Sequence, residues 1–179
     1  CRIRERGAGT MKPTKAAQTV DAQGRSVAPG IFGVVIHRLV TLSDERGSLT
    51  ELYRQSWGIH PEGLVYAKLL TVRPGRIRGY AMHKKQDDRI CILYGAAQYV
   101  LYDDRETSPT YRLVQEVNID EHGRAMLVIP AGVWHAVRNV GHTDLIMVNL
   151  PNQLYDHANP DKFRLPPEND VIPYTWRPL

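Results

Sequence analysis

The chain is built from short runs of β-branched and aromatic residues separated by Gly, Pro, Asn and Asp. Between 111 and 119, apolar residues such as Val117 and Ile119 alternate imperfectly with polar ones such as Glu116, and this period of two indicates a half-buried strand. No long segment has convincing helical periodicity. The sequence therefore predicts an all-β protein of about nine short strands. The predicted strands cover 31–40, 48–55, 64–73, 76–83, 89–102, 111–119, 124–129, 133–140 and 143–150.

These strands must hide their edges by closing on themselves or doubling up, which predicts a jelly-roll β-barrel. A length of 179 residues suits one domain with a single sizeable core. We expect the barrel to span 31–150, with room inside for one ligand. Residues 151–179 should form an irregular tail that packs aromatic side chains on the barrel. Those aromatic residues are Tyr155, Phe163, Tyr174 and Trp176.

Residues 1–30 are polar and lack apolar periodicity, which predicts a flexible or loosely docked arm. The chain starts with Cys1, and a methionine follows at Met11. We therefore expect residues 1–10 to be vector-derived or upstream-translated sequence that lies outside the domain.

Composition narrows the class of partner. Lys and Arg total 23 against 19 Asp and Glu, and the net charge of +4 is spread along the chain except for a basic N-terminal decapeptide. A nucleic-acid-binding protein would cluster its cations more strongly. The apolar runs fall short of the roughly 18–20 residues that a membrane-spanning helix needs. Two cysteines cannot build a disulfide framework, so we expect a cytoplasmic protein. The charge distribution and the short apolar runs predict that it has no nucleic-acid or membrane partner.

One candidate ligand-binding motif runs from Gly75 to Gly95. It resembles the first cupin motif, in which two histidines and a glutamate stand between two glycines. Both glycines and the second histidine, His83, are in register. Ala81 stands where the first histidine belongs, and Asp88 stands where the glutamate belongs.

A second motif matches the other cupin signature without a gap, through Pro130, Gly132, His135 and Asn139. Four fixed residue types at fixed spacing rarely coincide by chance. A strand, a Pro-Gly turn and a second strand at this spacing can aim the imidazole of His135 into the barrel mouth. His83 can approach the same point from another strand.

Two interpretations of these residues stay open. His83, Asp88 and His135 could converge on a divalent transition metal such as iron, manganese or nickel, because imidazole and carboxylate groups suit all three. Alternatively, no cofactor binds, the two histidines form hydrogen bonds inside a polar pocket, and Asp88 pairs with Arg89 or with a lysine at the rim.

Longer blocks narrow the resemblance. The segments DERGSLTELY at 44–53, IRG at 77–79, YDDRETSPT at 102–110 and IPAGVWH at 129–135 are similar in order and spacing to dTDP-4-dehydrorhamnose 3,5-epimerases. The resemblance extends from about residue 40 to residue 140. It implies a cupin jelly-roll, a nucleotide-sugar ligand, isomerase chemistry in carbohydrate biosynthesis, and a homodimer that forms through an edge strand.

The resemblance also implies binding residues. Arg46 and Glu51 match positions that help to hold the nucleotide-sugar in that family. Arg78, the arginine before the next glycine, matches another such position. A planar guanidinium grips phosphate oxygens with two hydrogen bonds, which suits this role. Arg89 would take the place of the family's lysine after a shift of one residue. We add His135, at the barrel mouth, as a further substrate-binding candidate. In a dimer, Arg46 would reach into the partner's pocket.

The catalytic positions depart from the family. Those enzymes use a histidine base, a tyrosine acid on the opposite face and a lysine that stabilises an enolate. Here the corresponding residues are Ala81, Asn149 and Asp88. His83 lies two residues after Ala81, on the same strand face, and can replace the base. Tyr155, six residues after Asn149, is our candidate for the acid.

Three functional hypotheses follow. The first is proton transfer on a nucleotide-activated keto sugar, which would epimerise or isomerise it. The second is metal-dependent chemistry on a small organic substrate. The third is a binding module for sugars or nucleotides that has lost turnover, because fold and binding residues can persist when a reaction is lost.

Overall fold

The computed structural model describes residues 15–23 and 26–179, so the expectation for residues 1–10 lies outside the described residues. No helix in the described part of the chain has the length and apolar character to cross a membrane. The elements are β1 (Val35–Arg38), β2 (Thr41–Asp44), β3 (Gly47–Thr50), the 3₁₀ turn η1 (Gln55–Trp57), β4 (Lys68–Val72), β5 (Ile77–Met82), β6 (Asp88–Tyr94), β7 (Ala96–Asp103), β8 (Val114–Asp120), β9 (Ala125–Ile129), β10 (Val133–Asn139), β11 (Leu145–Asn149) and β12 (Phe163–Arg164).

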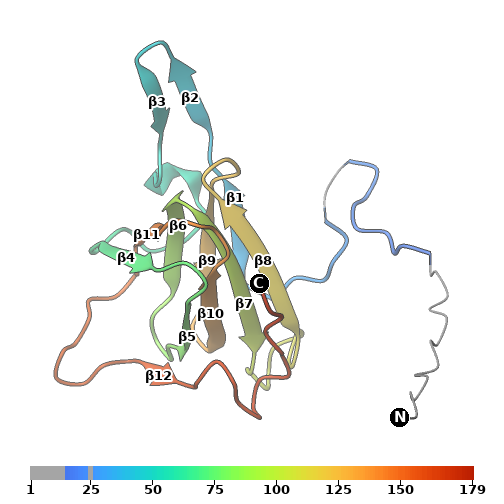
Figure 1. Ribbon diagram of the computed structural model, residues 1–179. Helices are drawn as coiled ribbons and strands as arrows, with labels where there is room; N and C mark the ends of the chain where they lie inside the picture. The colour runs from blue at the N-terminus through green and yellow to red at the C-terminus, as the bar shows by residue number, and fades with distance from the viewer. Residues whose placement is uncertain (1–14, 24–25) are drawn as a thin grey trace, which may run out of the picture.

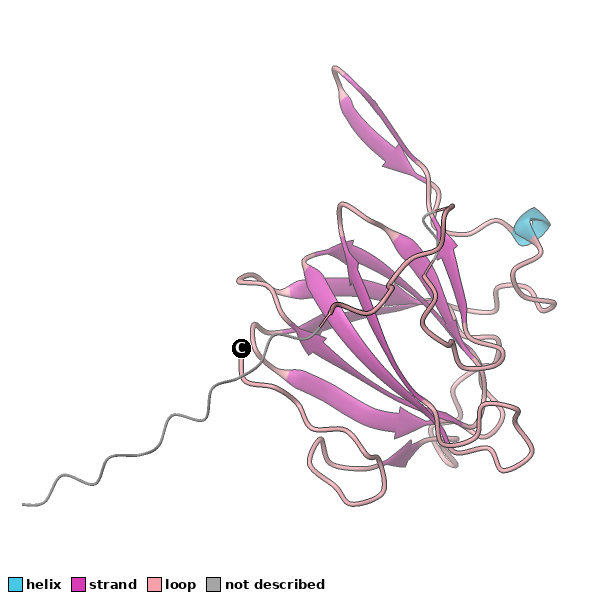
Figure 2. Ribbon diagram, turned by 90° about the vertical axis from the view of Figure 1, so that its right-hand side faces the viewer, coloured by secondary structure: helices cyan, strands magenta, loops and turns pink. Residues whose placement is uncertain are grey.

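Two antiparallel five-stranded sheets form the body of the protein. One has the strand order β1-β9-β6-β11-β4 and the other β12-β5-β10-β7-β8. Figures 1 and 2 show the two sheets facing each other, while the β2–β3 hairpin projects from one end. The predicted all-β jelly-roll is therefore confirmed.

The predicted strand 89–102 is in fact two strands, β6 and β7. Gly95 lies between them with a φ of +91°, a conformation that residues with a side chain seldom adopt. A Cβ atom at Gly95 would lie 3.1 Å from the Cα atom of Leu145. Both strands are buried, so their apolar residues continue across the turn, and hydrophobicity alone did not reveal the break.

The main core lies between the two sheets. Along β8, Val117 and Ile119 are buried while Glu116 and Asn118 are exposed, as the alternation in the sequence predicted. Neighbouring strands contribute inward residues in the same way, because alternate side chains of a strand point to one face. The largest fully buried members of this cluster are Tyr99, Ile92, Leu101, Leu127, Ile129, Leu145, Met147 and Val133.

The C-terminal tail packs on the outer face of the second sheet. Its strand β12 pairs with the end of β5, and Leu165 exchanges two backbone hydrogen bonds with Tyr80, at 2.8 and 3.1 Å. Further along, Ile172 is buried, and Tyr174 and Trp176 pack against the same cluster as Trp134. The tail thus carries residues 162–165 back to the mouth of the barrel.

Candidate functional site

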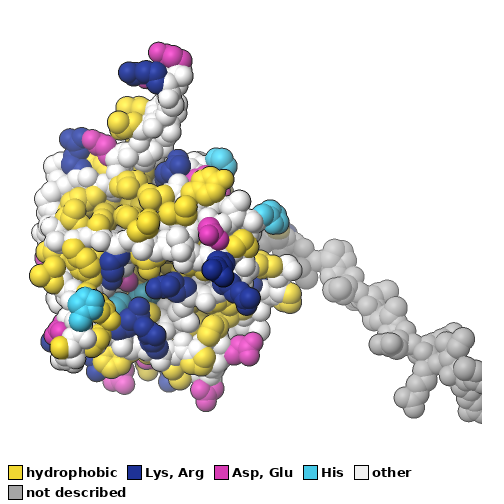
Figure 3. Space-filling view, turned by 60° about the vertical axis from the view of Figure 1, so that its left-hand side comes forward, with side chains coloured by type: hydrophobic (Ala, Val, Ile, Leu, Met, Phe, Trp, Pro, Cys, Tyr) yellow, Lys and Arg dark blue, Asp and Glu magenta, His cyan; other side chains and the backbone are white. Residues whose placement is uncertain are grey.

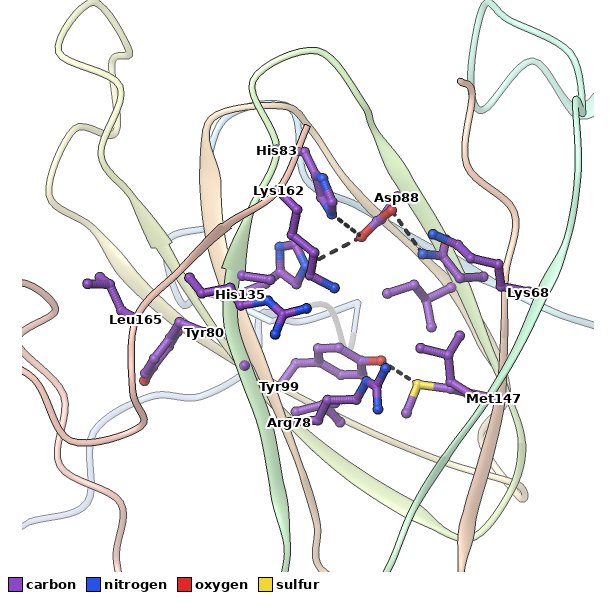
Figure 4. Close-up of a pocket in the computed structure, with 17 residues that line it drawn as sticks. Lys68, Arg78, Tyr80, His83, Asp88, Tyr99, His135, Met147, Lys162 and Leu165 are labelled. Carbon is purple, nitrogen blue, oxygen red and sulfur yellow. Dashed lines mark hydrogen bonds and ion pairs between the residues drawn. The ribbon is translucent and has the colours of Figure 1, made fainter. Parts of the chain in front are cut away.

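A cavity of about 300 Å³ opens between the two sheets. Strands β4, β5, β6, β7, β10 and β11 line it, and the tail around β12 closes one side (Figure 4). Apolar side chains such as Leu70, Ile90 and Val137 make up part of the wall. The polar and charged lining residues are Lys68, Arg78, Tyr80, His83, Asp88, Tyr99, His135, Asn149, Lys162 and Arg164.

Strand pairing brings both histidines to this cavity. In the register of β5 and β10, His135 stands opposite Ala81, and His83 follows two residues later. The amide of Gly132 donates a hydrogen bond of 2.7 Å to the carbonyl of His83, which ties the end of β5 to the turn before β10. Asp88 approaches from β6 in the facing sheet. The predicted convergence of His83, Asp88 and His135 is present in the structure.

Close packing of β5 on β10 requires a glycine beside the site. Gly79 has a φ of +128°, and a Cβ atom there would lie 2.7 Å from the Cα atom of Ala136. The register between the two strands shifts at this point, between His135 and Val137. The glycine that follows Arg78 therefore lets β5 bend against β10 and leaves Arg78 at the cavity.

Asp88 forms the polar centre of the cluster. Its Oδ2 atom lies 3.4 Å from Nε2 of His135 and 3.8 Å from Nε2 of His83. Its Oδ1 atom accepts hydrogen bonds from Gln86 at 2.6 Å and from Asn149 at 2.9 Å. Burial alone would raise the pKa of Asp88, but the histidines and Asn149 outweigh it and hold this pKa well below its usual range. Asp88 is therefore ionised at neutral pH.

His83 is held by the C-terminal tail. Its Nδ1 atom donates a short hydrogen bond to the backbone carbonyl of Asp161. Because a carbonyl only accepts, this contact places the ring proton on Nδ1 and leaves Nε2 free to accept one. Burial lowers the pKa of His83, although the charge of Asp88 opposes the shift. At neutral pH His83 is thus an unprotonated base with Nε2 on the cavity side.

Cations surround the remaining space. Lys68, Arg78, Lys162 and Arg164 line the cavity, and Asp88 is the one acidic side chain among its described lining residues. Burial lowers the pKa of Lys162, and repulsion from Arg164 and Arg78 adds to the shift. Figure 3 shows Lys and Arg side chains gathered on one face of the molecule. Such a cavity favours an anionic ligand.

Two predicted binding residues lie on the projecting hairpin or just after it. The side chain of Arg46 is 82% exposed and pairs with Asp44 at 2.5 Å. Glu51 is exposed and pairs with Arg54. Neither Arg46 nor Glu51 lines the cavity of its own chain, because the hairpin extends away from the barrel (Figure 1).

Arg89 is placed differently from the prediction. It follows Asp88 on β6 and therefore points to the opposite face of the sheet. Its guanidinium is fully buried and donates to four backbone carbonyls. Arg89 therefore does not line the cavity. These carbonyls belong to Leu150 at 2.6 Å, Glu62 at 2.7 Å, Gly63 at 2.9 Å and Pro151 at 3.1 Å. Arg89 anchors two loops.

Tyr155, the predicted acid, also lies outside the cavity lining. Its ring contacts His157 edge-on at 4.9 Å between ring centroids, and Nζ of Lys68 lies 5.7 Å from the ring centroid. Tyr99 on β7 lines the cavity instead, although the sequence did not single it out. The period of two along Ala97, Tyr99 and Leu101 would have predicted its inward direction.

Fold and site together define a jelly-roll protein with a cationic cavity of a size and charge that suit a small anionic ligand. Residues 42–163 match the model of the family described as "Polysaccharide biosynthesis C-terminal domain". The chain belongs to this family, within the group of sugar epimerases that resemble dTDP-4-dehydrorhamnose 3,5-epimerase.

Three relatives illustrate the group. The "Probable low-salt glycan biosynthesis epimerase Agl13" of Haloferax volcanii is 34% identical over 152 residues, which cover 83% of this chain and 96% of that protein. The dTDP-4-dehydrorhamnose 3,5-epimerase of Streptomyces griseus is 31% identical over 133 residues, or 70% of this chain and 65% of that protein. A dTDP sugar isomerase from Desulfovibrio desulfuricans shares the fold with a TM-score of 0.76 at 22% identity, over 82% of this chain and 92% of that one.

Proposed function

We propose that this protein is an epimerase or isomerase of nucleotide-linked keto sugars, with His83 as the base that removes a proton next to the carbonyl group. The observation that carries the proposal is the free Nε2 atom of His83, held by Asp161 at the wall of a cationic cavity. Names of relatives support the reaction class, since one is an epimerase of glycan biosynthesis and another acts on a dTDP-linked sugar.

Each charged group has a role in this reaction. Arg78, Lys162 and Arg164 would bind the diphosphate or an enolate oxygen, because guanidinium and ammonium groups donate to oxyanions. Asp88 would stabilise the imidazolium form of His83 after proton transfer, since its carboxylate lies 3.8 Å from Nε2. His135, on the other side of Asp88, would share that carboxylate or contact the sugar.

We further propose a homodimer in which Arg46 and Glu51 act on the partner's cavity. Neither residue lines the cavity of its own chain, and the hairpin exposes Leu42 and Leu49 by 67% and 62%. Exposed leucines at an edge favour pairing with a second copy. Sedimentation of the wild type against a Leu42→Ser, Leu49→Ser variant tests this, and a wild type that stays monomeric at all concentrations would contradict it.

The direct test is proton exchange. Wild-type protein is incubated in deuterated water with dTDP-4-keto-6-deoxyglucose, and NMR follows deuterium incorporation next to the carbonyl group. We expect incorporation that His83→Ala abolishes and that the surface variant His122→Ala leaves unchanged. Binding of the nucleotide-sugar without exchange would instead identify a non-catalytic binding protein. Restoration of exchange by Ala81→His in an inactive wild type would identify position 81 as the missing base.

A metal-dependent function is the second candidate, and one observation favours it. The Nε2 atoms of His135 and His83 both face Oδ2 of Asp88, at 3.4 and 3.8 Å, so a metal ion that displaced a proton from between them would have three ligand atoms. The three ligand atoms lie within 4.8 Å of one another, and their types suit iron, manganese or nickel. Such an ion would supply Lewis-acid chemistry to a substrate carbonyl.

Elemental analysis of protein purified without chelator tests this second function, together with titration by manganese and nickel under calorimetry. We expect stoichiometric binding that is lost in His135→Ala if the site holds a metal. Protein that contains no stoichiometric transition metal and takes up neither ion would remove this candidate and leave the epimerase proposal intact.

A further inference from the structure

Tyr99 has a buried hydroxyl group with an unusually weak partner. The residue is 1% exposed, and its O–H group donates to the Sδ atom of Met147 at 3.1 Å. A thioether sulfur is a poor acceptor compared with a carbonyl or carboxylate oxygen. A ligand oxygen or carbanion that enters the cavity would therefore be a better acceptor than the one that Tyr99 has in the protein alone.

The hydroxyl group lies across the cavity from the proposed base. In Figure 4, His83 and Asp88 stand at one end of the cavity, and the Tyr99 hydroxyl stands at the other beside Met147 and Arg78. Tyr99 lies on β7 and His83 directly follows β5, two strands of the same sheet that are separated by β10. A sugar ring between the two ends would have the imidazole near one face and the phenol near the other.

No other described tyrosine offers this geometry. Tyr80 also lines the cavity, but its ring packs in the outer cluster, 6.1 Å from the ring centroid of Trp176. Its hydroxyl points away from the cavity (Figure 4). Tyr155 lies outside the lining, against Lys68 and His157. Tyr99 is therefore the phenol within reach of a ligand in the described cavity.

The protonation state suits a donor. Burial raises the pKa of Tyr99 strongly, and the nearby charge of Asp88 raises it further. The phenol consequently keeps its proton at neutral pH. A phenol that can donate a proton and the Nε2 atom of His83, whose Nδ1 is occupied by the carbonyl of Asp161, thus line one cavity, which is the arrangement that acid and base catalysis requires.

We propose that Tyr99 is the catalytic proton donor that completes inversion, on the face of the sugar opposite His83. The inference rests on the proposed epimerase function. The C–H bond next to the carbonyl group breaks and its proton passes to Nε2 of His83, which leaves an enolate. The O–H bond of Tyr99 then breaks as a new C–H bond forms on the other face. Water returns the proton to the phenolate and takes one from the imidazolium, so protons balance.

Tyr99→Phe tests the proposal, because it removes the hydroxyl and keeps the buried ring. The variant is incubated with dTDP-4-keto-6-deoxyglucose in deuterated water, and NMR measures exchange and formation of the inverted sugar separately. We expect inversion to fall by about 100-fold or more, while exchange with retention of configuration continues within about threefold, since His83 still removes and returns a proton on its own face. Tyr102→Phe, on the other face of β7, serves as the matched control and should keep both rates.

The outcomes separate the two proposals. A wild type that exchanges, with a Tyr99→Phe variant that inverts at the wild-type rate, overturns the role of Tyr99 alone. A wild type without exchange overturns the epimerase function itself.

If Tyr99→Phe fails to fold, site-specific 3-fluorotyrosine at position 99 replaces it, because fluorine makes the phenol more acidic. The basic limb of the inversion rate should then move to lower pH, and an unmoved limb would overturn the proposal.

Discussion

The backbone carbonyl of Asp161 accepts the Nδ1 proton of His83, and the side chain of the same aspartate holds the turn that follows this histidine. Its carboxylate accepts the amide hydrogens of Lys84, Lys85 and Gln86 at 2.9, 2.7 and 3.1 Å. One residue of the tail thus fixes both the tautomer of His83 and the turn that follows it. The proposed base is therefore positioned by a segment far from it in sequence.

Replacing Asp161 should disturb the reaction without removing any group that touches substrate. In Asp161→Ala three backbone amides lose their acceptor, the tail loosens, and His83 loses its fixed orientation. We expect kcat/KM for exchange to fall by about 10- to 100-fold, and the ¹⁵N spectrum of His83 to show a mixture of tautomers. Asp156→Asn is the control, because Asp156 caps an exposed turn. An unchanged tautomer in Asp161→Ala would contradict this role.

The pH dependence of exchange should follow His83. Its pKa lies below the ordinary value of 6.5 because burial disfavours the imidazolium. The neutral form is the base, so activity is full at neutral pH and declines as the pH falls through this lowered pKa, by about tenfold per pH unit. Asp88→Asn removes the charge that stabilises the imidazolium and should move the acid limb to still lower pH. An acid limb above 6.5 would argue against His83.

The cations of the tail should determine affinity for the nucleotide-sugar. Lys162→Met and Arg164→Met each remove a positive charge from the cavity lining and keep much of the side-chain volume. We expect each to raise KM by about 10-fold, with a smaller salt dependence than the wild type. The exposed Arg73, outside the lining, provides Arg73→Met as a charge-matched control. Equal KM values in the tail variants and the control would show that these cations do not bind the ligand.

Arg89 should matter for folding rather than for binding. Arg89→Met leaves four backbone carbonyls without their donor, two of them in buried hydrogen bonds, and we expect the free energy of unfolding to fall by about 2–4 kcal/mol. Arg124→Met removes a donor from a single carbonyl, that of Leu93, and should cost less. Urea denaturation measures both. A stable Arg89→Met variant with weakened nucleotide-sugar binding would instead support the role that the sequence predicted for Arg89.

Sequence pattern was a good guide to the barrel because strand alternation is a local property. The pairs of inward and outward residues on β8 follow from period two alone, and the spacing of Pro130, Gly132 and His135 predicted a histidine at the barrel mouth. Convergence of His83, Asp88 and His135 followed from motif spacing in the same way.

The sequence pattern predicted the cavity-lining residues poorly in two situations. In one, the lining depends on which face of a strand a residue occupies. In the other, it depends on the path of an irregular segment. Arg89 and Asp88 are neighbours in sequence but lie on opposite faces of β6, so a shift of one residue changes a ligand contact into a loop anchor. Lys162 and Arg164 reach the cavity through a tail without periodicity, and no local rule indicates where such a segment goes. Tyr99 belongs to the main core as well as to the cavity lining, so its sequence pattern on β7 is that of an ordinary core residue.

The two-residue strand β12 has a consequence for how this protein can diversify. It pairs only with Ala81 and Met82 at the end of β5, yet it brings Arg164 and the adjacent Lys162 to the cavity. The main core between the sheets includes neither of these cations. Under the proposed function, substitutions at Lys162 or Arg164 would alter ligand preference without changing the core between the sheets. Ligand specificity and barrel stability would then be selected at different residues.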